Sequence, residues 1–288
     1  MEDHGLVADL EAIMALKASR RKSLRWLALG SFGAAGLPLL GCGGGADATM
    51  TSSSSSSSST TSSGSSSSGT SSSSCPVIPE ETAGPYPGDG TNSNGSGIVN
   101  VLTVSGVVRK DIRSSFNGAT AVADGVPLTI KLKINNANAS CGAAGGFSVY
   151  LWHCDKDGNY SLYSSGVTNQ NYLRGVQEAD SNGEVSFTTI YPGCYSGRVP
   201  HVHFEIFPSL AKSSSVLNRI KTTQLTFPMA TSQEVYTDTR YTSSVRNLAQ
   251  ISFATDNIFS DGTSLQMATV TGNVKDGYVA TLTVNVSG

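Results

Sequence analysis

The chain has 288 residues, a formal net charge of −2 and a pI of about 6.1. Only 14% of its residues are charged. This balance excludes the basic footprint that nucleic-acid-binding proteins carry, so we expect no nucleic-acid partner.

The first 41 residues have the pattern of a bacterial export signal. Arg20 and Arg21 resemble a twin-arginine motif, and an apolar run follows over 26–40. That run is too short for a membrane span, and it ends in a lipobox-like Leu-Leu-Gly before Cys42. We therefore predict a signal peptide over 1–41 and a lipidated Cys42. The alternative is an ordinary secretory signal with an incidental cysteine.

Residues 42–74 are low in complexity. Three glycines follow Cys42, and a Ser/Thr-rich tract occupies 51–74. Such a tract cannot bury apolar surface and behaves as a flexible linker. We expect one folded domain over 75–288, long enough for a single core. The plan predicts an exported protein, tethered to the bacterial cell envelope and in contact with the membrane only through its lipid.

Four of the five cysteines lie in the predicted domain. An even number in an exported domain permits two disulfides, with three possible pairings. A zinc site is the alternative, but no CxxC spacing supports it. The candidate disulfide residues are Cys75, Cys141, Cys154 and Cys194.

Apolar residues in the domain alternate with a period of two, which predicts strands rather than helices. Turn residues at 155–159 and 180–183 predict hairpins between successive runs, and only 244–250 has helical character. The pattern indicates an all-β, two-sheet sandwich with long loops. The predicted strands cover 99–108, 127–134, 147–152, 184–190, 201–207 and 278–286.

His201 and His203 are the main candidate metal ligands. Alternation along a strand places both on one face. Two phenols precede them, Tyr195 on a Pro-Gly loop and Tyr160 directly after an Asp-Gly-Asn turn. Phenolate is a hard anionic donor that a trivalent cation holds deprotonated, so this set suits Fe(III) better than Zn(II) or Fe(II). Glu205 lies on the same face and is an alternative third ligand.

Five ordered segments resemble the intradiol ring-cleavage dioxygenases, most closely the β chain of protocatechuate 3,4-dioxygenases and exported relatives of that type. Together the segments span most of 75–288. The helical segment through which catechol 1,2-dioxygenases dimerise has no counterpart here, so no oligomeric state is predicted. The matching segments are 79–86, 149–152 with 158–160, 191–195, 198–204 and 223–227.

The resemblance implies an enzyme with a non-haem Fe(III) cofactor that cleaves a catechol-type ring with O2 to a cis,cis-muconate-type product. The implied iron ligands are Tyr160, Tyr195, His201 and His203. Tyr195 corresponds to the axial phenolate, which the catecholate displaces and which then takes a substrate proton.

The resemblance also assigns residues around the substrate. Arg198 would stabilise negative charge that develops on the ring, and Gln224 would be its polar neighbour. The segment Gly84, Pro85 and Tyr86 would line the mouth of the pocket. No basic residue stands out as a clamp for a carboxylated ring, which leaves catechol and hydroxyquinol as candidate substrates.

Two other function classes fit parts of the sequence. A non-catalytic β-sandwich that binds carbohydrate or protein at the cell surface would also suit a lipid tether. A cupin-type enzyme would use His201, His203 and Glu205, but cupins place the carboxylate further along the strand than Glu205 lies. His153 is expected to point away from the site and to have a structural role.

Overall fold

The computed structural model describes residues 75–288. The predicted signal peptide over 1–41, the lipidated Cys42 and the linker over 42–74 lie outside the described residues. Within 75–288, no helix combines the length and the apolar character needed to cross a membrane.

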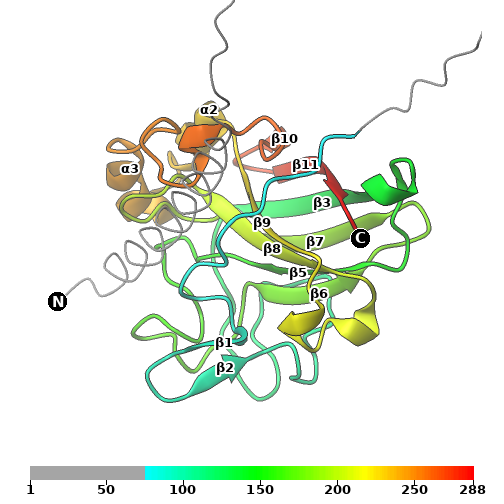
Figure 1. The fold of residues 1–288 in the computed structure, drawn as a ribbon. Coiled ribbons are helices and arrows are strands. Elements are labelled where there is room, and N and C mark those ends of the chain that lie inside the picture. Colours follow the sequence, from blue (N-terminus) through cyan, green and yellow to red (C-terminus); the bar gives the residue numbers. More distant parts are fainter. Residues whose placement is uncertain (1–74) are drawn as a thin grey trace, which may run out of the picture. The chain divides into compact units, whose positions relative to one another are not determined.

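Two β-sheets pack against each other, as the alternating pattern predicts (Figure 1). The first, called the β3 sheet, consists of β10 (Thr269–Asn273), β11 (Gly277–Val286), β3 (Pro127–Asn136), β7 (Glu184–Ile190) and β4 (Gly142–Ala143). The second, called the β8 sheet, has the order β6 (Arg174–Glu178), β5 (Ser148–Trp152), β8 (His201–Phe207) and β9 (Lys221–Thr226). Neighbouring strands are antiparallel, except that β11 runs parallel to β3.

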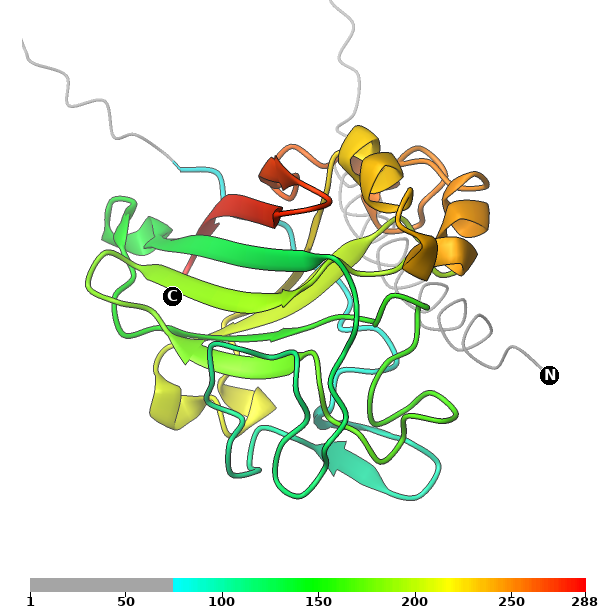
Figure 2. The ribbon, with the colours of Figure 1, turned by 180° about the vertical axis from the view of Figure 1, so that it is seen from behind.

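Smaller elements complete the domain. A hairpin of β1 (Asp89–Ser93) and β2 (Ile98–Asn100) lies beyond the β8 sheet on the side away from the β3 sheet (Figure 1). Two α-helices, with the segment that follows them, gather at one end of the sandwich (Figure 2). They are α2 (Met229–Val235) and α3 (Thr242–Leu248), and the short 3₁₀ turns are η1 (Ala137–Ala139), η2 (Leu210–Lys212), η3 (Val216–Asn218), η4 (Thr239–Tyr241) and η5 (Phe259–Asp261).

The core lies between the two sheets. On β3, Leu128, Ile130 and Leu132 are buried, while the residues between them are partly or fully exposed. Every residue of β8 is buried, on both faces. The inner face of β8 packs into the core, and the outer face is covered by loop residues such as Val101 and Val107. The β8 sheet therefore has two dry faces, whereas the β3 sheet has one.

One predicted strand is wrong. The run over 99–108 continues β2 only to Asn100 and then turns, with the amide of Val104 donating to Val101 and that of Val107 donating to Val104. Its apolar residues pack on Tyr150 and Trp152 instead of pairing in a sheet. The other five predicted strands are present, and α3 confirms the helical prediction at 244–250 to within two residues at each end.

Both predicted turns form, but neither closes a simple hairpin. Asp155 Oδ1 accepts the amides of Asp157 and Asn159, yet the strand that pairs back on β5 begins only at Arg174. The turn at Asp180 leads from β6 in one sheet to β7 in the other. Gly183 has φ +77, and a Cβ there would meet the carbonyl of Ile134 at 2.3 Å, so this crossing needs glycine.

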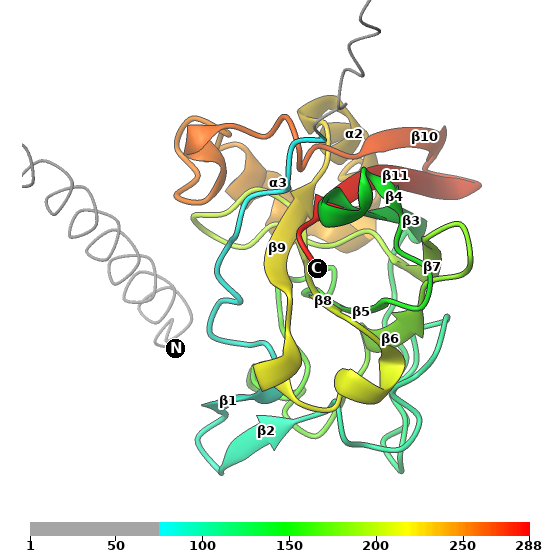
Figure 3. The same ribbon diagram turned by 45° about the vertical axis from the view of Figure 1, so that its right-hand side comes forward.

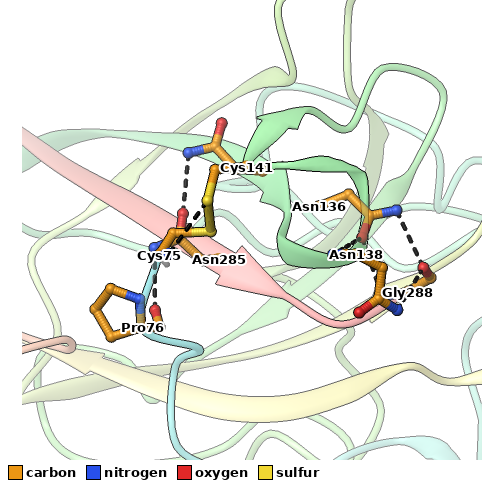
Figure 4. Close-up of a disulfide and its surroundings, with 8 residues drawn as sticks. Cys75, Pro76, Asn136, Asn138, Cys141, Asn285 and Gly288 are labelled. Carbon is orange, nitrogen blue, oxygen red and sulfur yellow. Dashed lines mark hydrogen bonds between the residues drawn. A yellow bond between two sulfur atoms is a disulfide. The ribbon is translucent and has the colours of Figure 1, made fainter. Parts of the chain in front are cut away.

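One disulfide joins Cys75 to Cys141, in the loop that follows β3 (Figure 4). Next to it, the Asn285 side chain donates to the carbonyl of Pro76 at 3.0 Å, which fastens the start of the domain to β11. The expectation of two disulfides is wrong, because Cys154 and Cys194 are buried free thiols. The bond also withdraws two cysteines from the alternative zinc site.

Candidate metal centre

Strand pairing brings the site residues to the outer face of the β8 sheet. Val202 and Phe204 face the core, so His201 and His203 point the opposite way. Trp152 of β5 and Gln224 of β9 lie directly opposite His203 on its two neighbouring strands. The alternation thus places the histidine pair as the sequence predicts.

Four donor atoms converge. The Nε2 atoms of His201 and His203 lie 3.2 Å apart. The Tyr195 hydroxyl lies 3.2 Å from His201 Nε2, and the Tyr160 hydroxyl lies 3.4 Å from it. Ligands that bind one metal ion at about 2 Å stand roughly 3 Å from their neighbours in the coordination shell. The spacing fits a single metal ion held by two imidazoles and two phenols.

His201 presents its Nε2 lone pair to this point. The Nδ1 of His201 lies 2.7 Å from the carbonyl of Val199, which accepts a hydrogen bond only from a protonated Nδ1. The His203 ring stacks on Trp152 with centroids 5.0 Å apart. Burial, then the positive charge of Arg198, hold the pKa of both imidazoles well below the usual value. Both rings are therefore neutral, as metal ligation requires.

Glycines allow the two tyrosine loops to approach each other. Gly158 has φ +89, and a Cβ on it would come within 2.9 Å of the Tyr195 Cβ. A Cβ on Gly193 would meet the backbone carbonyls of Asp155 and Lys156 within 2.7 Å. Because both positions are glycine, the 155–160 turn and the 193–195 loop pack closely and bring Tyr160 and Tyr195 together.

Helix α3, rather than a disulfide, holds the Tyr195 loop. The amide of Cys194 donates to Ser244 Oγ at 2.9 Å, and Asn247 Nδ2 donates to the carbonyl of Cys194 at 2.7 Å. The thiol of Cys194 lies 3.3 Å from the carbonyl of Arg198. The prediction of a disulfide at Cys194 is wrong, because its thiol is free.

Arg198 and Gln224 lie beside the donor cluster, as predicted. Arg198 is buried, and its Nη1 lies 3.4 Å from His201 Nε2. Its Nη2 donates to Gln224 Oε1 at 2.7 Å, and Gln224 Nε2 donates to the carbonyl of Thr82 at 3.0 Å. Gln224 thus connects the guanidinium to the segment before Gly84, which runs alongside β9 (Figure 3).

The predicted pocket segment lies next to the cluster. A narrow surface depression is lined by Ala83, Gly84, Pro85, Tyr86, Trp152, Tyr160, Tyr195 and His203. The Tyr86 ring lies 5.3 Å from that of Tyr160. Buried Arg174, which the sequence did not single out, donates to the carbonyls of Tyr86 and Ser161 at 2.9 Å and joins the two segments.

Two polar residues of the same region lie outside the cluster. Arg219 Nη1 donates to Glu205 Oε1 at 2.8 Å, so the alternative in which Glu205 ligates metal has no support. Burial, with the nearby charge of Asp89, raises the pKa of Glu205 to about 8. His153 Nε2 lies 2.7 Å from Thr189 Oγ1 on β7, which agrees with its expected structural role.

The phenols are essential to any metal site here. Among residues 75–288, no group of three or more His, Cys, Asp and Glu side chains could hold a metal ion. Two histidines alone supply too few donors, and the remaining ones are Tyr160 and Tyr195. Such a mixed nitrogen and phenolate set favours a hard, trivalent cation.

No model of a known protein family matches the chain, and no curated protein matches it in sequence. Solved structures do. An intradiol ring-cleavage dioxygenase from Tetranychus urticae is similar with a TM-score of 0.57 and 22% identity, over 74% of this chain and 95% of that one. A dioxygenase domain from Streptomyces sp. SirexAA-E, part of a fusion with a carbohydrate-binding protein, has a TM-score of 0.45 and 21% identity, over 74% and 99%. On the first of these likenesses, the domain has the fold of an intradiol ring-cleavage dioxygenase.

Proposed function

We propose that this chain is a non-haem Fe(III) intradiol dioxygenase that cleaves a catechol-type ring with O2 to a cis,cis-muconate-type product. The observation that carries the proposal is the convergence of three donor atoms on His201 Nε2. His203 Nε2 and the two phenol oxygens all lie within 3.4 Å of it. When bound there, a ferric ion supplies the Lewis acidity that holds phenolates and activates a catecholate ring toward O2.

The two tyrosines differ in a way that suits different roles. Tyr160 is only 3% exposed and lies under Tyr86, whereas Tyr195 is half-buried and precedes two exposed residues. Tyr195 would therefore be the phenol nearer to an entering catechol. Its oxygen would accept a proton from a substrate hydroxyl, so the loop would supply a general base at the point of substrate entry.

Arg198 supplies a positive charge beside the donor cluster, outside the pocket lining and paired with Asp256. Its Nη1 faces the ligand atoms in a dry environment, where a fixed cation stabilises developing negative charge more than in water. Trp152 and Pro85 add apolar walls that exclude water from the ring.

The pocket wall favours an uncharged ring. None of its residues is charged, and nearby Arg174 is buried and donates to backbone carbonyls. A carboxylated ring would lose its hydration without gaining an ion pair. We therefore expect a higher kcat/KM for catechol than for protocatechuate, by about tenfold or more for a cost of ~1.4 kcal/mol.

The activity can be tested with the full chain supplied with ferrous iron under air. We expect about one iron per chain, O2 uptake with catechol and a muconate-type product identified by its ultraviolet absorption and mass. Lys133→Ala, on the exposed face of β3, is the matched control and should retain all three. A chain that binds no iron and consumes no O2 would instead be a binding module.

We also propose export and lipid anchoring through Cys42, which the arginine pair and the lipobox-like sequence support. In a bacterial host, the chain should incorporate labelled fatty acid and sediment with membranes, while Cys42→Ser should do neither. Equal labelling of both would refute anchoring at this residue.

A further inference from the structure

Asp256 is a buried carboxylate that the sequence did not single out. It is fully buried and lies in the segment after α3. Its oxygens accept backbone amides from Val199 at 2.8 Å, Ile258 at 2.8 Å and Phe259 at 3.1 Å. Three donors from a folded backbone fix the position of this carboxylate.

The same carboxylate binds Arg198 through Nε, at 3.1 and 3.2 Å from its two oxygens. The two terminal nitrogens also have partners on the side of the site. Nη2 reaches Gln224 at 2.7 Å, and Nη1 lies 3.4 Å from His201 Nε2. The plane of the guanidinium is thereby set by partners on two sides.

The buried charges of Arg198 and Asp256 compensate each other. Arg198 and Asp256 are 4% and 0% exposed in their side chains, so water compensates neither charge. A buried pair that loses one partner leaves an uncompensated charge, which moves or unfolds its surroundings.

We propose that Asp256 is a positioning residue, which acts through Arg198 by holding Nη1 toward the ligand atoms and the substrate ring. The inference rests on the proposed function, because the orientation of Arg198 matters only if a substrate binds beside it. A purely structural carboxylate would stabilise the segment after α3 without affecting the reaction.

The test compares Asp256→Asn, Arg198→Lys and the double variant in the iron-loaded full chain. A misplaced guanidinium should lower kcat for catechol about 100-fold with less than ~3-fold change in KM. Because the two residues act as a unit, the double variant should lose no more than ~3-fold beyond the worse single variant. The visible band of the iron-loaded protein should shift in Asp256→Asn, while the iron content stays at the wild-type value.

Asp238→Asn is the matched control. Asp238 also accepts a backbone amide and pairs with an arginine, Arg240, but outside the site. It should leave kcat and the visible band unchanged. If Asp256→Asn does not fold, Asp256→Glu keeps the charge and displaces the guanidinium, and it should fold with a kcat at least ~10-fold lower.

The outcomes separate the two proposals. An active, coloured wild-type protein whose folded Asp256 variants keep their kcat and visible band overturns the positioning role. Multiplicative losses in the double variant do so as well. A wild-type chain that binds no iron and cleaves no catechol refutes the proposed function instead.

Discussion

The two sheets differ in what covers the face that points away from the core. On the β3 sheet that face carries Lys131 and Lys133 and is exposed to solvent. On the β8 sheet the corresponding face carries Trp152 and His203 and is buried under loops. The same period of two produces both sheets, so the pattern alone does not distinguish them. The burial of polar residues does.

Buried polar side chains need hydrogen-bond partners. On the outer face of the β8 sheet, Glu205 accepts from Arg219, and Thr226 donates to the carbonyl of Pro200. His201 and His203 instead direct their Nε2 atoms at each other. The β8 sheet thus separates side chains with structural partners from side chains that require a ligand.

The largest effect is expected when one proposed ligand is removed from the buried outer face of the β8 sheet. His203→Ala should reduce iron affinity and ring cleavage by at least ~100-fold, because loss of a direct ligand exceeds the loss of an outer-shell partner. Iron content and O2 uptake measure this, with Lys133→Ala as the control on the exposed face. Retention of full iron content in His203→Ala would show that the cluster is not the metal site.

A core substitution on the same strand should have a different signature. Phe204 lies next to His203 but faces the core and is fully buried. Phe204→Ala should lower the free energy of unfolding by about 3–5 kcal/mol, because it leaves a cavity between the sheets. Denaturant titration measures the loss. The iron-loaded variant should keep its visible band below the transition, and loss of the band in the folded protein would contradict the separation of the two faces.

The contact between His153 and Thr189 can be tested through the pH dependence of stability. Burial lowers its pKa from 6.5 to about 4. The unfolded chain therefore binds more protons between these values, so stability is lost as pH falls from 6.5 toward 4. His153→Gln should remove up to about 3 kcal/mol of that pH-dependent loss in metal-free protein, as measured by denaturation at pH 7 and pH 4.5. An unchanged slope would mean that His153 already carries a proton in the folded state.

The smallest effect is expected on the exposed face. Lys131 is exposed on β3, and among residues 75–288 it forms no ion pair at 4 Å or less. Lys131→Ala should change the free energy of unfolding by less than about 0.5 kcal/mol and leave catalysis unaffected. A loss above 1 kcal/mol would indicate that this face contacts another part of the protein.

Local patterns were enough to predict much of the sandwich and the four proposed ligands. The alternation in β3 and β8 is visible in the sequence, and the two tyrosines adjoin recognisable turns. Strand alternation fails at 101–107, because apolar residues there cover Trp152 without pairing in a sheet. No local signal marks Asp256 as the partner of Arg198, since 58 residues separate them and the contact exists only after folding. The pairing of Cys75 with Cys141 likewise depends on tertiary structure.

The most direct test of the metal centre is the visible absorption spectrum of the iron-loaded full chain and of its Tyr160→Phe and Tyr195→Phe variants. Two phenolate ligands predict a red-brown protein whose charge-transfer band weakens or shifts in each variant, and in the wild type when catechol is added without O2. A colourless protein, or a band that neither tyrosine substitution changes, would show that these phenols do not bind the metal.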